Sequence, residues 1–493
     1  MSKTIDKDII CDIIIIKDVK RKDYKMDQKE IYTKLKYKTK KVYDEISPEK
    51  RREMMDLADE YREFLDKGKT ERECVKIAIE MAEKNGFVPF CEKDSLKAGD
   101  RVYFTNRKKN IILAVIGEED ITKGINIVGA HIDAPRLDLK QNPLYQSKDM
   151  ALLKTHYYGG IKKYQWTAVP LALHGVCYTK DGEQIEINIG ENENDPVFCI
   201  TDLLPHLAKD QMAKKLSEAI EGEALNVLVG GMGVNDSDID DSVKFNILNI
   251  LNITYGITEE SFLSAEIEVV PAGKSRNVGI DSAFVGGYGQ DDRVCAFTAL
   301  KSILDVKVPG KTAMCLLVDK EEIGSTGNTG MLSKFFEMAT LELCEKVSGK
   351  NDMVTFNKVI RNSACMSSDV SAAVDPNYES AFEPQNSSFA GRGLALMKYT
   401  GSRGKSGASD ASSEFVHEIA TILNNNEVIW QTCELGKIDQ GGGGTIAMYV
   451  ANMNMDVIDC GVPVLSMHSP FEVTHKGDIY MAFEAYKAFY KDR

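Results

Sequence analysis

The segment INIVGAHID, residues 125–133, decides how the rest of the chain is interpreted. Its apolar, partly β-branched run predicts a buried strand that ends at His131. Asp133 follows two positions later, on the same side of an extended chain, where its carboxylate can accept the second ring N–H of the histidine. This arrangement suits a metal ligand with a supporting carboxylate. A buried histidine beside a helix-capping aspartate would give the same pattern.

Further apolar runs surround this segment. IILAVIG (111–117), TAMCLLVD (312–319) and VPVLSMHS (462–469) predict three more strands, and RVCAFTALKSILDV (293–306) predicts a helix between two of them. Strands that alternate with helices are typical of an α/β fold. The sequence therefore predicts an α/β core with a mostly parallel sheet.

The pattern changes between about Leu137 and Pro271. YYGGIKKYQW (157–166), GVCYTKDGEQIEINIG (175–190) and SAEIEVV (264–270) are typical of β-hairpins and turns. We interpret this region as a β-rich insertion. The predicted division is a first part of the α/β core with an N-terminal arm at 1–136, an inserted domain at 137–272, and a second part of the core at 273–493.

Two pairs of acidic residues follow predicted structural boundaries. GYGQDDRVCAF places Asp291 and Asp292 directly before a helix, and KEEIGSTG places Glu321 and Glu322 after a buried strand, where open α/β sheets bind ligands. Adjacent buried carboxylates repel each other unless one binds a cation and the other carries a proton. Helix capping and a plain surface loop are the alternatives.

Two more candidates occupy similar positions. Asp369 lies in SACMSSDVSAAVDP, and His468 comes at the end of the apolar run VPVLSMHS. Two histidines and three carboxylates are donors that suit zinc, manganese or cobalt. The carboxylates of Asp291, Glu322 and Asp369, together with one hydroxide, would balance the charge of two divalent ions.

In this order, the motifs HxD, QDDR, DKEEIGS, SSD and MHS resemble the aspartyl aminopeptidase and vacuolar aminopeptidase I family of two-zinc exopeptidases. The resemblance covers nearly all of residues 129–472. It implies a zinc-peptidase core interrupted by a β-rich dimerisation domain, and a tetrahedral shell of twelve subunits. The chain is therefore expected to be a homo-oligomer.

The resemblance also assigns roles to individual residues. Asp291 corresponds to the ligand that bridges two metals, and Glu321 to the catalytic base. Lys398 corresponds to a residue that contacts the substrate, where its ammonium group could pair with a substrate carboxylate. His206 corresponds to a histidine that reaches a neighbouring active site. The remaining ligand positions of the family fall, in two pairs, on His131 with Asp369 and on Glu322 with His468.

This sequence departs from the family pattern at two positions. Asp210 follows four residues after His206, and Ala372 stands where relatives often carry a histidine. These departures weaken the assignment of His206 and of a strict preference for acidic substrates.

Composition bears on which classes of partner the chain binds and on the compartment in which it works. The 493 residues carry a formal net charge of −14, which disfavours nucleic acid and anionic membranes. The odd count of 11 cysteines without a C-x-x-C pair indicates a reducing compartment, and we expect a cytoplasmic protein. The apolar stretch IICDIIII (9–16) is too short for a membrane span. The basic residues 17–42 predict a solvated arm ahead of a helix that contains Met54, Leu57, Tyr61 and Leu65.

The predicted function is therefore a metallo-aminopeptidase that uses two divalent ions, most readily Zn²⁺, to remove single residues from peptides with a free N-terminus. The sequence leaves two alternatives open. One is a carboxypeptidase or N-deacylase with the same metal ligands, and the other is a non-catalytic scaffold that retains the shell.

Overall fold

The computed structural model describes residues 28–236 and 238–493, and the chain divides into two compact units, Met1–Thr39 and Lys40–Arg493. In the first unit, the described part contains helix α2 (Gln28–Leu35), which has no buried residue. The apolar stretch 9–16 and residues 17–27 of the predicted basic arm lie outside the described residues. Among the helices that the structure describes, none is long and apolar enough to cross a bilayer.

A nine-stranded sheet forms the core of the second unit. Its four central strands, β13, β4, β14 and β18, are parallel, whereas antiparallel pairs occur at β2–β3, β3–β13 and β16–β18. The prediction of an α/β fold with a mostly parallel sheet is confirmed, with antiparallel strands added outside the centre. In sheet order the strands are β1 (Val88–Pro89), β2 (Arg101–Asn106), β3 (Asn110–Val115), β13 (Thr312–Val318), β4 (Ile125–His131), β14 (Ala364–Ser368), β18 (Asp456–Gly461), β16 (Leu394–Met397) and β17 (Trp430–Thr432).

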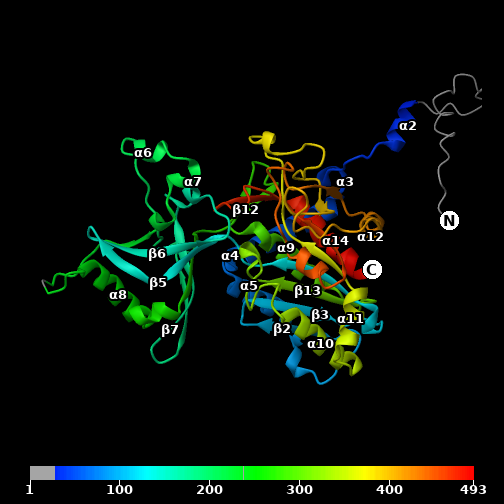
Figure 1. Cartoon of the computed structure of the whole chain (residues 1–493), viewed down its shortest axis with the longest axis horizontal. Helices are drawn as coiled ribbons and strands as arrows, with labels where there is room; N and C mark the ends of the chain where they lie inside the picture. The colour runs from blue at the N-terminus through cyan, green and yellow to red at the C-terminus, as the bar shows by residue number, and fades with distance from the viewer. Residues whose placement is uncertain (1–27, 237) are drawn as a thin grey trace, which may run out of the picture. The chain divides into compact units, whose positions relative to one another are not determined.

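Apolar side chains cover both faces of this sheet. Alternate residues of one strand enter different cores: Val128 of β4 packs with one set of helices, and Ile127 packs with the other. Both faces must be covered, which explains why these strands are continuous apolar runs rather than alternating ones. Figure 1 shows α9 and α14 on one side of the sheet and α10 and α11 on the other.

Helix α4 illustrates how local sequence signals fix a helix. Ser47 accepts a hydrogen bond from the Lys50 N–H, and Pro48 occupies the first helical position. Met54, Leu57, Tyr61 and Leu65 are all buried, as the helical spacing predicts. The α-helices of the second unit are α3 (Val42–Glu45), α4 (Pro48–Lys67), α5 (Glu71–Lys84), α6 (Lys209–Met212), α7 (Leu216–Ala219), α8 (Ser242–Tyr255), α9 (Gln290–Asp305), α10 (Phe335–Ser348), α11 (Met353–Asn362), α12 (Ser413–Asn425), α13 (Ala447–Ala451) and α14 (Lys476–Asp492).

A second, six-stranded sheet comes from the β-rich stretch of sequence. All of its pairings are antiparallel, α8 packs on it, and a separate apolar core fills it. All of its strands lie between Arg136 and Pro271. In sheet order they are β8 (Gln184–Ile189), β7 (Leu171–Tyr178), β10 (Glu266–Pro271), β5 (Arg136–Ser147), β6 (Met150–Tyr158) and β9 (Val227–Gly230).

A third sheet of five short strands carries the segments on either side of His468. Its order is β11 (Arg276–Val278), β12 (Phe284–Gly287), β20 (Glu472–His475), β19 (Pro463–Leu465) and β15 (Ser371–Ala372). Short 3₁₀ turns complete the chain: η1 (Phe90–Glu92), η2 (Ile121–Lys123), η3 (Lys163–Trp166), η4 (Gly222–Ala224), η5 (Glu259–Ser264), η6 (Glu321–Ile323) and η7 (Glu379–Ala381).

Candidate metal centre

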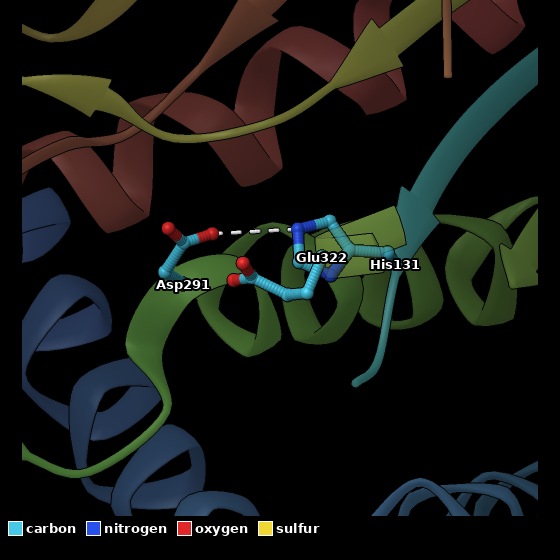
Figure 2. Close-up of side chains that lie close together, drawn as sticks. All are labelled: His131, Asp291 and Glu322. Atoms are coloured by element: carbon cyan, nitrogen blue, oxygen red, sulfur yellow. Dashed lines mark ion pairs between the residues drawn. The ribbon is translucent and has the colours of Figure 1, made fainter. Parts of the chain in front are cut away.

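Asp291 lies between two histidines. It stands at the beginning of α9, and one of its carboxylate oxygens, Oδ1, is 3.3 Å from His131 Nε2. The other oxygen, Oδ2, is 3.0 Å from His468 Nε2. Figure 2 shows the Asp291 carboxylate turned towards the His131 ring, with Glu322 beside them. The carboxylate therefore divides the cluster into a His131 half and a His468 half.

The His131 half is built from the ends of two central strands. β4 ends at His131, and Asp369 follows the neighbouring parallel strand β14, so both side chains emerge at the same edge of the sheet. Asp369 Oδ1 and Glu321 Oε2 each lie 4.0 Å from His131 Nε2. The Asp369 N–H donates to the Cys460 carbonyl at 2.8 Å, which fixes the backbone of this aspartate.

The His468 half is built from loops. Glu322 lies in η6, directly after β13, and its Oε1 is 3.5 Å from His468 Nε2. The sequence had suggested that His468 ends a strand, and this prediction is wrong. β19 ends at Leu465, and His468 lies three residues later with a φ of 63°. The apolar run VPVLSMHS divides at this turn because its last residues leave the sheet to reach Asp291.

Asp133 supports both halves. Its Oδ1 accepts from the Glu321 N–H at 3.1 Å and lies 3.3 Å from His131 Nδ1, and its Oδ2 accepts from the Glu322 N–H at 3.2 Å. The Asp133 carbonyl is also 3.0 Å from His131 Nδ1. A fully buried carboxylate thus sets the orientation of the His131 ring and of the Glu321–Glu322 turn.

Burial governs the charges of the cluster. It raises the pKa of Glu321 to about 7, and it holds the pKa values of Glu322 and Asp369 well above their ordinary range. Burial opposes ionisation of Asp291 too, but hydrogen bonds from His131 and His468 keep the pKa of this carboxyl below its ordinary value. The cluster therefore holds more carboxyl groups than the two histidines, His131 and His468, can neutralise.

This donor set fits divalent metal ions. Potential ligand atoms converge within 4.8 Å in two groups, His131 with Asp291 and Glu322, and His131 with Asp292 and Asp369. Glu322 Oε1 is buried and has no hydrogen-bond partner in the part of the chain that the structure describes. A buried carboxylate oxygen without a donor is costly unless a cation faces it. Imidazole nitrogens and carboxylate oxygens are ligands that zinc accepts.

Two predicted substrate contacts are not joined to this cluster by any described contact. Lys398 follows β16, is exposed, and places its Nζ 3.4 Å from Asp410 Oδ1. His206 lies on an exposed turn ahead of α6. Their predicted roles need a bound substrate or a second subunit.

Three residues that the sequence did not single out touch the cluster. Glu472 Oε1 accepts from the His468 N–H at 2.7 Å, and its Oε2 accepts from the Asp291 N–H at 3.1 Å. Tyr158 Oη donates to Asp133 Oδ2 at 2.8 Å, and the Gly160 carbonyl lies 2.8 Å from His468 Nδ1. Glu472 had a weak signal, since an acidic residue four positions after a candidate ligand can turn back to it.

Comparison with known proteins places this geometry in a family. The family described as aminopeptidase I zinc metalloprotease (M18) matches residues 64–490. The chain belongs to this family. A probable M18 family aminopeptidase 1 from Clostridium acetobutylicum is 50% identical over 454 residues, which are 91% of this chain and 97% of that protein.

Solved structures agree with this assignment. The M18 aminopeptidase from Thermotoga maritima has a TM-score of 0.90 at 44% sequence identity, over 93% of this chain and 100% of that one. The mApe1 dodecamer of S. cerevisiae, at 19% identity, shares the fold with a TM-score of 0.72, over 89% of this chain and 97% of that one. The resemblance to this family is confirmed, and the chain is a metal-dependent aminopeptidase of the M18 family.

Proposed function

We propose that the cluster holds two divalent metal ions, most readily Zn²⁺, with Asp291 as the shared ligand. His131 and Asp369 complete one metal site, and Glu322 and His468 complete the other. The supporting observation is that the two oxygens of Asp291 face two different histidines, at 3.3 and 3.0 Å. A carboxylate with one oxygen directed to each side is the arrangement that a bridging ligand requires.

Glu321 is the proposed catalytic base. When bound, the metal ions would polarise the scissile carbonyl and acidify the attacking water. Glu321 takes the proton of that water and later gives it to the leaving amine. Asp133 keeps the Glu321 backbone in place through the hydrogen bond from the Glu321 N–H.

The substrates are peptides with a free α-amino group, and the surface near Lys398 favours an acidic first residue. A cavity of about 200 Å³ is lined by Tyr399, the residue after Lys398, by three basic residues, Arg403, Lys405 and Lys437, and by one acidic residue, Glu434. Asp410 pairs with both Lys398 and Lys405, so an incoming carboxylate would compete with Asp410 for these ammonium groups.

The six-stranded sheet is the proposed contact with other copies of the chain. Leu203, Leu204 and Leu207, around His206, are at least half exposed, and Ile253 on α8 is 77% exposed. Exposed apolar side chains that lie close together, as these three leucines do along the chain, are typical of a protein interface. Assembly into a twelve-subunit shell, as in the yeast mApe1 dodecamer, would cover these side chains and bring His206 to a neighbouring active site.

A dipeptide panel tests the chemistry. Unblocked and N-acetylated dipeptides are incubated with the protein and added zinc, manganese or cobalt, with Glu321→Gln as the control. We expect release of N-terminal residues from unblocked peptides only, fastest for acidic first residues, and loss of turnover in the variant. Cleavage of acetylated peptides would indicate a deacylase or carboxypeptidase, and inactivity with every metal would indicate a scaffold.

Light scattering tests the assembly. A mass of twelve chains is expected for the wild-type protein. His206→Ala should keep that mass while it lowers turnover, because the histidine acts on a neighbouring site. A monomeric mass would contradict the shell.

A further inference from the structure

The end of strand β6 lies against both halves of the metal centre. Tyr158, the last residue of β6, donates from its Oη to Asp133 Oδ2 at 2.8 Å. Two residues later, the Gly160 carbonyl lies 2.8 Å from His468 Nδ1. Between them, a Cβ added at Gly159 would come within 3.2 Å of Glu322 Oε2. Three consecutive residues of the six-stranded sheet and its following turn therefore meet the centre of the catalytic core.

The contact of Gly160 fixes the state of His468. A carbonyl oxygen can only accept, so Nδ1 must carry a proton. Nε2, which faces Asp291 and Glu322, is then the nitrogen that can bind a metal once it gives up its own proton. A histidine that binds metal through one nitrogen usually donates from the other to a carbonyl or carboxylate. Gly160 fulfils that role for His468.

The contact of Tyr158 acts through Asp133. Asp133 is fully buried, and Tyr158 supplies the shortest of its hydrogen bonds. Without the hydroxyl, Asp133 Oδ2 would keep only the longer bond from the Glu322 N–H. Because Asp133 also orients the His131 ring, a loosened Asp133 would loosen ligands of both proposed metals.

Tyr158 is itself held firmly. The Arg136 guanidinium lies 3.9 Å from the centre of the Tyr158 ring. Arg136 in turn pairs with Glu71 of α5 at 3.6 Å and with Glu268 of β10 at 3.2 Å. All of these side chains except that of Tyr158 are at least nine-tenths buried, so the catalytic core and the six-stranded sheet share one ion-pair network behind the tyrosine.

We propose that Tyr158 and Gly160 are positioning residues of the aminopeptidase, through which the six-stranded sheet of the same chain completes both proposed metal sites. This inference rests on the ligands assigned under the proposed function. It gives the sheet a role in catalysis within a single subunit, in addition to any contact between subunits.

The test compares Tyr158→Phe with Tyr157→Phe, a neighbouring substitution of the same kind on a half-exposed ring that makes no described contact with the cluster. Three quantities are measured: the melting temperature of the metal-free protein, the affinity for Zn²⁺ in competition with a chromophoric chelator, and the visible spectrum of the Co²⁺-loaded protein. Tyr158→Phe should keep the metal-free melting temperature, bind metal about tenfold more weakly, and change the Co²⁺ spectrum. Its kcat should fall while KM stays constant, and Tyr157→Phe should match the wild type throughout.

Gly160→Ala provides an independent variant if Tyr158→Phe proves unstable. Its φ is not in the left-handed region, and the added Cβ would meet His468 Nδ1 at 3.3 Å, so the ring must shift. Weaker binding of one of the two metals is expected. Wild-type metal affinity in either folded variant would overturn the inference. His131→Ala separates the two proposals: if it binds metal normally, the ligand assignment itself fails.

Discussion

The two halves of the proposed metal centre are built in different ways. The His131 side chain is 2% exposed and belongs to a central strand of the nine-stranded sheet. The His468 side chain is 34% exposed, stands in a turn with positive φ, and is held by the Gly160 carbonyl and by Glu472. The first half follows from the packing of the core, whereas the second is assembled from turns that other parts of the chain must hold in place.

This difference has a thermodynamic consequence. Ligands on a packed strand are already ordered before metal binds, so little conformational entropy is lost on binding. Ligands on turns lose more freedom, and their metal should dissociate more readily. The following predictions test whether the two halves differ in this way, beginning with the largest expected effect.

Glu321 and Glu322 are adjacent but face different halves, and their glutamine variants should behave differently. Glu321→Gln should lower kcat by about 10²–10⁴-fold with full metal content, because the variant loses the proton acceptor but no proposed ligand. Glu322→Gln should lose metal from the His468 half. Steady-state kinetics and metal analysis on the same preparations distinguish these outcomes. Loss of metal in Glu321→Gln would contradict the assignment of this residue as a base.

Metal removal should proceed in two steps. With a chromophoric chelator in excess, metal from the His468 half should appear first, and metal from the His131 half about tenfold more slowly. His468→Ala should abolish the fast step and keep the slow one. A single release phase in the wild-type protein would show that the two halves are equivalent.

A methyl group tests how tightly each half is packed. A Cβ at Gly461 would lie 1.8 Å from the Asp369 carbonyl oxygen, so Gly461→Ala should lower the free energy of unfolding by about 3 kcal/mol. Gly160→Ala, which meets only the His468 ring, should cost less than about 1 kcal/mol.

Gly231→Ala is the control for this pair, since a Cβ there meets nothing within 4 Å. Denaturant unfolding of the metal-free proteins gives all three values. Equal costs at Gly461 and Gly160 would contradict the difference in packing between the two halves.

The same difference explains what the sequence could predict. His131 ends a buried strand, and Asp369 and Glu322 follow two others. The carboxyl ends of these strands meet at one edge of the sheet, so local patterns were enough to place the three residues near each other. His468 was predicted as a neighbour of these residues, but its turn was not, because the apolar run gives no sign of where the strand ends.

The supporting contacts of Tyr158 and Gly160 had no local signal. Tyr158 is 25 positions from Asp133, and Gly160 is 308 positions from His468. Such pairs depend on how the six-stranded sheet packs against the core, which hydrophobic periodicity does not specify. No described contact joins Lys398 or His206 to the cluster, so their roles remain predictions.

As the pH falls, the His468 half should lose stability before the His131 half does, because of His475 at the end of β20. The His475 ring packs edge-on against Tyr43 and Phe284, and its Nδ1 accepts from the Gly477 N–H at 3.1 Å. Burial lowers the pKa of His475 to about 4. Because the folded-state pKa lies below the unfolded value of about 6.5, the stabilising contribution is complete above pH 6.5 and is lost as the pH falls towards 4.

At pH 5 this loss should reach about 2 kcal/mol relative to pH 7.5, at about 1.4 kcal/mol per pH unit below 6.5. Chelator-treated wild-type protein and His475→Asn, which keeps a helix-capping side chain, are compared by denaturant unfolding at both pH values. The variant should lose about 2 kcal/mol less than the wild type. Since β20 begins at Glu472, which holds the His468 backbone, the fast step of metal release should also accelerate at pH 5 more in the wild type than in the variant. If the free energy of unfolding depends equally on pH in both proteins, His475 does not contribute to the acid sensitivity of this half.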